Sequence, residues 1–127
     1  MQHTVRFSEV DAAGIVFFSR VFEWCHHAFE DVLRARGLPI TDVADRPWLM
    51  PLVHASADYR RPLRLGDAVD IAVQDPQLGE GSVTWSFEIR GADGVCATVR
   101  HVHACIDRET FRPIPVPDSV RRALEAG

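Results

Sequence analysis

The sequence contains no lysine, so its fourteen basic residues are all arginines, against eighteen acidic residues and a formal net charge of −4. Without a broad positive field the chain is unsuited to non-specific nucleic-acid binding, and we expect no nucleic-acid partner. The arginines suit a more local task, because a guanidinium group can form two parallel hydrogen bonds with a phosphate.

Cysteine is scarce as well: Cys25, Cys96 and Cys105 form an odd set without a C-x-x-C spacing. Such a set argues against a disulfide framework and favours a reducing compartment. The longest apolar run, residues 12–18, is far shorter than the ~20 residues that cross a bilayer, and the first residues do not resemble a signal peptide. We therefore expect a cytoplasmic protein without a membrane partner.

Motifs of several common enzyme classes are also absent. No glycine-rich phosphate loop follows a predicted strand, no G-x-S-x-G segment offers a nucleophile elbow, and no H-E-x-x-H pair offers zinc ligands. His101 and His103 alternate along one predicted strand, but no suitably spaced carboxylate accompanies them. We expect neither a metal ion nor another cofactor.

The residues that are present fit one soluble domain spanning 1–127, with 46% apolar and 25% charged residues. Ser19 is a suitable N-cap and Gly37 a suitable C-terminal stop for a long helix over residues 19–36. A shorter helix is expected over residues 118–125. The apolar residues of the long helix recur at helical spacing: Val21, Phe22, Cys25, Phe29, Val32 and Leu33.

After the long helix the apolar period changes to two, which predicts antiparallel strands. The alternation is clearest at Val69, Ile71 and Val73 and again from Val83 to Ile89. Further strands are expected at 4–8, 49–59 and 96–106. The sequence thus predicts an α+β fold in which a curved antiparallel sheet of about five strands wraps one long helix.

A carboxylate just ahead of the long helix is the first candidate for chemistry. Asp11 lies in a turn of small residues, eight positions before the expected helix start. The backbone N–H groups near Phe18 form the positive end of the helix and can stabilise an oxyanion, while Asp11 can attack a carbonyl or activate water. The simpler alternative is that Asp11 only caps a turn in which Gly14 gives the backbone its freedom.

The motif at residues 11–18, DAAGIVFF, followed by a helix and Gly-Leu-Pro, resembles the 4-hydroxybenzoyl-CoA thioesterase family of hotdog-fold enzymes. The resemblance covers nearly the whole chain in element order. Within that family the chain is most similar to the 1,4-dihydroxy-2-naphthoyl-CoA thioesterases of quinone biosynthesis. The stretches that carry this narrower resemblance are 25–30, 51–56 and, more weakly, 66–67 and 102–106.

The resemblance implies that Asp11 is the catalytic carboxylate, either as nucleophile or as general base, and that the Phe18 N–H polarises the thioester carbonyl. It also implies an active site at the interface of a homodimer, which can pair further into a homotetramer. Gly14, Phe17 and Phe22 would contact the acyl group, with the alternative that the two phenylalanines simply belong to the core. Hydratases of the same fold place a histidine five residues after the aspartate, and Val16 occupies that position here.

Two histidines are further candidates for the acyl site. His26 lies one helical turn beyond Phe22, at a position where the 4-hydroxybenzoyl enzymes carry a carboxylate that meets the ring hydroxyl. This departure favours the naphthoyl branch, although His26 can equally be a histidine at the edge of the core. His54 would contact the substrate near the thioester or serve as a strand histidine at the interface.

Arg60, Arg61 and Arg64 concentrate positive charge after a predicted strand, where guanidinium groups could bind the phosphates of CoA or simply face solvent. The 4-hydroxybenzoyl enzymes carry basic residues in the loop that matches 79–82, whereas here only Ser82 could donate to a phosphate. We expect hydrolysis of 1,4-dihydroxy-2-naphthoyl-CoA, with 4-hydroxybenzoyl-CoA or another small acyl-CoA as alternative substrate. A non-catalytic acyl-binding hotdog module is the alternative of a different class.

Overall fold

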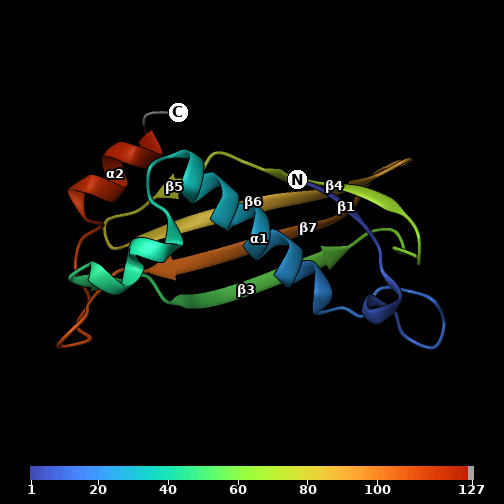
Figure 1. The fold of residues 1–127 in the computed structure, drawn as a ribbon, viewed down its shortest axis with the longest axis horizontal. Helices are drawn as coiled ribbons and strands as arrows, with labels where there is room; N and C mark the ends of the chain where they lie inside the picture. Colours follow the sequence, from blue (N-terminus) through green and yellow to red (C-terminus); the bar gives the residue numbers. More distant parts are fainter. Residues whose placement is uncertain (126–127) are drawn as a thin grey trace.

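The long helix α1 (Arg20–Ala35) lies across one face of an antiparallel sheet (Figure 1). The computed structural model describes residues 1–125, apart from the side chains of residues 43 and 44. The strand order is β1-β4-β6-β7-β3, and the short β5 pairs with β6, so the expected α+β fold is confirmed. The strands of this sheet are β1 (Gln2–Thr4), β3 (Leu52–Tyr59), β4 (Ala68–Val73), β5 (Gln77–Leu78), β6 (Ser82–Gly91) and β7 (Gly94–Ala104).

Smaller elements close the end of the molecule at which α1 ends (Figure 1). The 3₁₀ helix η2 (Ile40–Asp45) leads into β2 (Trp48–Leu49), which pairs with β8 (Ile106–Asp107). The last helix, α2 (Asp118–Glu125), has the predicted bounds. The strand expected over residues 49–59 is divided between β2 and β3, with Pro51 between them; its carbonyl accepts a hydrogen bond from the Ala104 N–H at 3.0 Å.

The strand expected over residues 4–8 is wrong in its position. The strand β1 ends at Thr4, and Phe7–Glu9 forms the 3₁₀ helix η1 instead. The physical reason is local, because a carboxylate oxygen of Glu9 accepts a hydrogen bond from the Arg6 N–H at 2.8 Å and closes the turn. An apolar and polar alternation cannot reveal a turn that one side chain holds closed.

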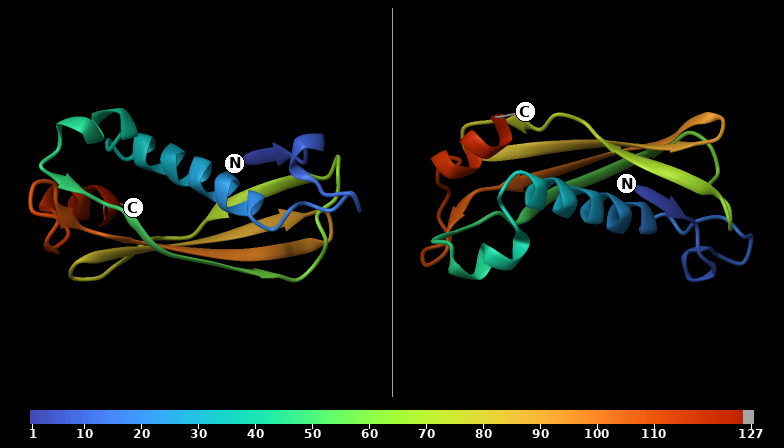
Figure 2. Two further views of the ribbon diagram at one scale, coloured as in Figure 1. Left: turned by 90° about the horizontal axis from the view of Figure 1, so that it is seen from below. Right: turned by 45° about the horizontal axis from the view of Figure 1, so that its top comes forward.

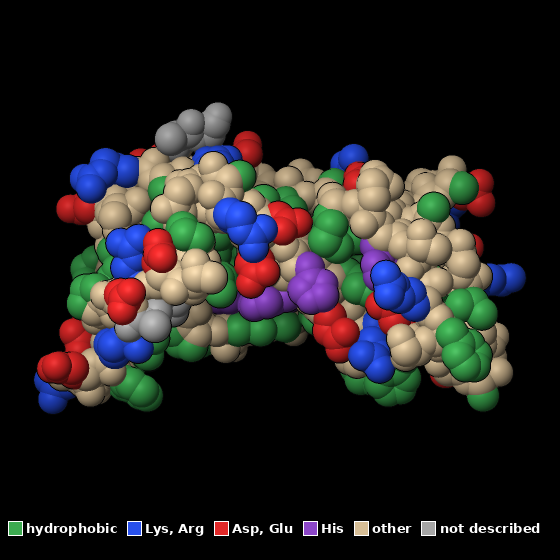
Figure 3. All heavy atoms as spheres, viewed as in Figure 1, with side chains coloured by type: hydrophobic (Ala, Val, Ile, Leu, Met, Phe, Trp, Pro, Cys, Tyr) green, Lys and Arg blue, Asp and Glu red, His purple; other side chains and the backbone are tan. Residues whose placement is uncertain are grey.

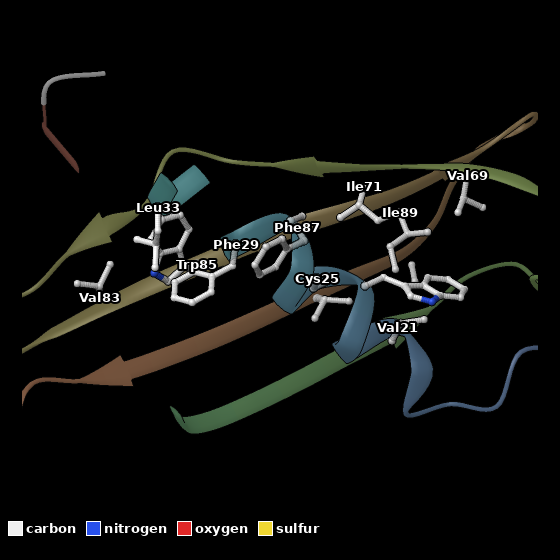
Figure 4. Close-up of a cluster of buried hydrophobic side chains, with 14 of the residues drawn as sticks. Val21, Cys25, Phe29, Leu33, Val69, Ile71, Val83, Trp85, Phe87 and Ile89 are labelled. Carbon is white, nitrogen blue, oxygen red and sulfur yellow. The ribbon is translucent and has the colours of Figure 1, made fainter. Parts of the chain in front are cut away.

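The core lies between α1 and the face of the sheet toward it. Cys25, Phe29 and Leu33 of α1 point toward this face in Figure 4, and Phe29 meets Trp85 edge to face with ring centroids 4.9 Å apart. Every second residue of β6 is buried in this layer, and each contributes about 1.5–3 kcal/mol by leaving water. These are Val83, Trp85, Phe87 and Ile89.

The opposite face of the sheet carries small and polar side chains, such as Thr84, Ser86 and Glu88, which are only half-buried. Figure 2 shows α1 on one side of the sheet and no helix over the other within residues 1–125. None of the described helices is long and apolar enough to cross a membrane.

Two histidines of β7, His101 and His103, are buried in the core layer. Burial lowers the pKa of His101 to about 4, with the neighbouring His103 and His26 adding to the effect. Burial also lowers the pKa of His103. Both imidazoles are therefore neutral in the folded chain near neutral pH, whereas in the unfolded chain they titrate near 6.5.

We expect the free energy of unfolding to fall as the pH is lowered from about 6.5 to 4, because the unfolded chain takes up these protons first. His101 contributes on the order of 3 kcal/mol to this fall, because its pKa is lowered from 6.5 to about 4 in the folded chain. Urea unfolding at a series of pH values measures it, and His101→Leu should flatten the curve. His27→Gln, at an exposed position of α1, is the control. An unchanged slope in His101→Leu would contradict the assignment.

Candidate active site at the start of the long helix

Asp11 lies in a tight loop that its own side chain holds in place. Its Oδ1 accepts hydrogen bonds from the Ala13 N–H at 2.9 Å and the Ile15 N–H at 3.2 Å, and its carbonyl accepts one from the Gly14 N–H at 3.0 Å. Gly14 has a φ of +76°, which favours glycine there. One carboxylate oxygen thus caps the turn, while Oδ2 has no partner within residues 1–125 and the side chain is exposed.

The buried carboxylate of Glu9 fixes this loop to the body of the molecule. Glu9 Oε1 accepts hydrogen bonds from His3 Nε2 and the Arg6 N–H, both at 2.8 Å, and Oε2 accepts one from Trp24 Nε1 at 2.7 Å. Burial raises the pKa of Glu9, but these hydrogen bonds outweigh it and hold the pKa below its ordinary value. Glu9 is therefore a positioning residue that the sequence analysis missed, because no local spacing indicates a bond to Trp24.

The loop also closes on itself next to α1. Val10 forms a bridge with Val16, and the Phe17 N–H donates to the Glu9 carbonyl at 2.9 Å. Asp11 and Phe18 therefore lie at the two sides of one closed loop.

The start of α1 offers open backbone donors. Ser19 precedes the first helical residue, as predicted, but its side chain makes no capping hydrogen bond. Within residues 1–125 the N–H groups of Phe18 and Ser19 have no acceptor, whereas the Phe18 carbonyl accepts a hydrogen bond from the Tyr59 hydroxyl. This end of the helix can therefore donate to an oxygen that gains negative charge.

Two of the predicted CoA-binding arginines lie beside this helix start. Arg60 and Arg61 line a groove of about 350 Å³ together with Phe18, Ile15 and Tyr59. Arg61 also lines a second groove with Arg64. The structure thus brings Arg60 and Arg61 close to the start of α1, while Arg64 forms a bridge with Ile15 in the loop before it.

Ser82 lies elsewhere in the chain. It begins β6 opposite Ala104, while the Arg60 N–H is bonded to the carbonyl of Cys96. These two points are eight residues apart along β7, which corresponds to about 26 Å. One chain therefore does not bring Ser82 to the arginines.

The predicted acyl contacts in α1 and just before it differ in their exposure. Phe17 is 49% exposed, with its ring centroid 4.9 Å from that of Phe18. Phe22 is half-buried and His26 is exposed, with the His26 ring 5.2 Å from Phe29. Figure 3 shows histidine side chains at the centre of this face, in the hollow between the two ends of the molecule.

His54 points in another direction. The register pairs Leu52 with buried His103, but a bulge follows, and His54 pairs with Val102. Residues directly opposite each other share a face of the sheet, so His54 lies on the face away from α1. A single chain does not bring His54 to Asp11.

Comparison with known proteins places this arrangement in a family. Residues 5–124 match the model of the "Thioesterase-like superfamily". A 1,4-dihydroxy-2-naphthoyl-CoA hydrolase of Nostoc punctiforme is 35% identical over 96% of this chain and 83% of its own.

Solved structures agree with the sequence match. The 1,4-dihydroxy-2-naphthoyl-CoA thioesterase from Synechocystis superimposes with a TM-score of 0.88 at 26% identity, covering 98% of this chain and 93% of its own. A gentisyl-coenzyme A thioesterase superimposes with a TM-score of 0.85 at 27% identity, covering 98% of both chains. With its hotdog fold and an Asp11 loop ahead of α1, the chain belongs to the thioesterase-like superfamily, as its motif predicts.

Proposed function

We propose that the protein hydrolyses 1,4-dihydroxy-2-naphthoyl-CoA to the free acid and CoA. The observation that carries this proposal is the pairing of Asp11, with one carboxylate oxygen free, and the open N–H groups at the start of α1. The similarity to hydrolases of this thioester supports the choice of acyl group.

Phe18 and Asp11 have separate roles in the proposed reaction. The Phe18 N–H donates to the carbonyl oxygen, so negative charge that develops there is stabilised. Asp11 then either attacks the carbonyl carbon, which gives an anhydride that water later cleaves, or removes a proton from the attacking water. In both routes the carbon–sulfur bond breaks, and the leaving thiolate takes up a proton, from Asp11 in the general-base route and from solvent in the nucleophile route.

The site is complete only in a two-fold dimer that we propose to form through β3. This strand ends the order of the main sheet, so one of its edges is unpaired within residues 1–125. Leu52 and Val53 on it are 46% and 60% exposed. Two copies that pair antiparallel along this edge form one continuous sheet, with both helices on the same face and running in opposite directions.

The same pairing brings Ser82 of one subunit nearer to the proposed CoA-binding arginines of the other. A two-fold axis through the middle of β3 sets Leu52 opposite the partner's Tyr59, and therefore Pro51 opposite the partner's Arg60. Ala104 donates to the Pro51 carbonyl, and Ser82 pairs with Ala104. Ser82 and the partner's Arg60 are then three strand spacings apart, or about 14 Å. We propose that Ser82 of one subunit and the arginines of the other bind the phosphates of one CoA.

Kinetics with five thioesters test the proposed substrate. We expect kcat/KM for 1,4-dihydroxy-2-naphthoyl-CoA to exceed that for benzoyl-CoA and for a short aliphatic acyl-CoA by about a hundredfold, or roughly 2.7 kcal/mol. The second candidate is a hydroxylated benzoyl-CoA, which the similarity to the gentisyl-coenzyme A thioesterase favours. It takes the place of the first if gentisyl-CoA or 4-hydroxybenzoyl-CoA leads. Equally slow turnover of all thioesters would favour an acyl-binding module.

A further inference from the structure

A cavity of about 150 Å³ lies at the far end of α1 from Asp11. It is enclosed by the second half of α1, η2, β2 and β7, and its walls are mostly apolar. The rings of Phe29 and Trp48 and the side chains of Leu33, Leu38 and Met50 line it. Such a space fits a flat aromatic group.

His103 contributes to the lining of this cavity, and its ring has a hydrogen-bonding atom without a partner within the described residues. His103 is 3% exposed, and its Nδ1 lies 3.0 Å from the Met50 carbonyl oxygen. A carbonyl can only accept, so Nδ1 carries the proton. Because burial lowers the pKa of this imidazole, the ring is neutral, and Nε2 is left with a lone pair. Within the described residues this Nε2 is buried without a partner.

The neighbours of His103 hold its ring in a fixed orientation. Its ring stacks on Phe29 with centroids 4.7 Å apart and an angle of 11°, which fixes the plane of the imidazole. The His26 ring centroid is 6.3 Å away. A buried acceptor without a partner is unfavourable, and a donor that enters the cavity removes this penalty.

We propose that the cavity binds the hydroxylated ring of the acyl group and that His103 Nε2 accepts a hydrogen bond from a ring hydroxyl. The proposal rests on the proposed function and names the feature of the substrate that this end of the site selects. A hydroxyl satisfies Nε2, whereas a methoxy group, which has no proton to donate, does not.

The proposed dimer brings this cavity to the catalytic end of the partner. Leu52 pairs with His103 on one side and faces the partner's Tyr59 on the other. His103 is thus two strand spacings, or about 10 Å, from the strand position of the partner's Tyr59, whose hydroxyl bonds the carbonyl of Phe18 in the same subunit. Within one subunit the cavity is further from the catalytic end. Phe29 in the cavity wall lies nine residues beyond the first residue of α1, or about 14 Å along the helix axis.

Binding of small probes tests the role of His103 without any thioester. Calorimetry with 1-naphthol and 1-methoxynaphthalene should show about tenfold tighter binding of the naphthol to the wild-type protein. His103→Leu should bind both probes with equal affinity. His101→Leu is the matched control, because His101 is equally buried on the same strand but does not line the cavity, and it should keep the preference. A preference that survives in His103→Leu, or that is absent from the wild type, overturns the proposal.

A second measurement needs no variant and covers the case in which His103→Leu does not fold. The ¹⁵N resonance of His103 Nε2 in the wild-type protein should shift when 1-naphthol is added and stay in place with 1-methoxynaphthalene. An unchanged resonance with both probes overturns the acceptor role.

The kinetic arm separates this inference from the proposed function. His103→Leu should lower kcat/KM for 1,4-dihydroxy-2-naphthoyl-CoA about tenfold more than for 2-naphthoyl-CoA, and equal losses would overturn the acyl subsite. If the wild-type protein cleaves neither thioester but prefers the naphthol through His103, the proposed function fails and the acceptor role of His103 stands.

Discussion

Replacing Asp11 by asparagine lowers kcat by about a thousandfold or more, while the fold and the affinity for the acyl-CoA remain. The amide oxygen can still accept the hydrogen bonds from the Ala13 and Ile15 N–H groups, so the loop keeps its shape. An amide, however, neither attacks a thioester nor takes a proton from water. Steady-state kinetics with 1,4-dihydroxy-2-naphthoyl-CoA, together with circular dichroism of both proteins, measures the effect.

The chain offers a matched control for this substitution. Asp107 closes a similar turn at the other end of the molecule, where its Oδ1 accepts hydrogen bonds from the Glu109 and Thr110 N–H groups, both at 2.9 Å. Asp107→Asn should keep kcat within about twofold, because it changes the same chemical group in a turn without a catalytic role. An Asp11→Asn enzyme that kept most of its activity would rule out Asp11 as nucleophile or base.

Replacing Ala55 by proline should convert the proposed dimer into a monomer and lower kcat/KM at least about a hundredfold, because the two halves of each proposed site separate. The Arg60 N–H bonds the Cys96 carbonyl, which makes this a hydrogen-bonded pair of the β3–β7 ladder. Such pairs alternate along a ladder, so the N–H of Ala55 points to the free edge. Proline at that position removes an edge donor and leaves the bonds to β7 in place.

Sedimentation equilibrium gives the mass of the Ala55→Pro protein, and circular dichroism shows whether it folds. Ala55→Ser keeps the N–H and should remain a fully active dimer. If Ala55→Pro folded, stayed dimeric and stayed active, β3 would not be the interface.

The elements that the sequence predicts well depend on contacts between residues that are close together in the sequence. The face of α1 follows from residues three and four apart, and α2 is bounded by a proline-rich stretch and its own apolar spacing. The loop of Asp11 is equally local, because its hydrogen bonds reach only to Ala13 and Ile15. For this reason a short motif was enough to indicate both the fold and the turn that holds Asp11.

Other features depend on contacts that no local pattern contains. Glu9 bonds Trp24 fifteen residues further on, and Tyr59 bonds Phe18 across forty-one residues. The face on which His54 lies depends on a bulge after Leu52, since a one-residue slip reverses the direction of every later side chain.

Some residues with proposed roles in one site are far apart within a single folded chain. Ser82 and the arginines are distant within one subunit, and His26 is exposed. Their proposed roles in binding CoA and the acyl group require a second subunit, and they stay predictions. Periodicity describes a single chain, so it has no means of indicating surfaces that two chains share.

The position of β3 in the chain has a consequence for protein synthesis. During translation β3 leaves the ribosome some forty residues before β7, its partner in the ladder. Until β7 arrives, both edges of β3 are open, and afterwards one edge stays open in the single chain. An unpaired strand with exposed Leu52 and Val53 can template pairing with the wrong chain. If the proposed dimer forms through β3, the step that completes it also shields the nascent protein from aggregation.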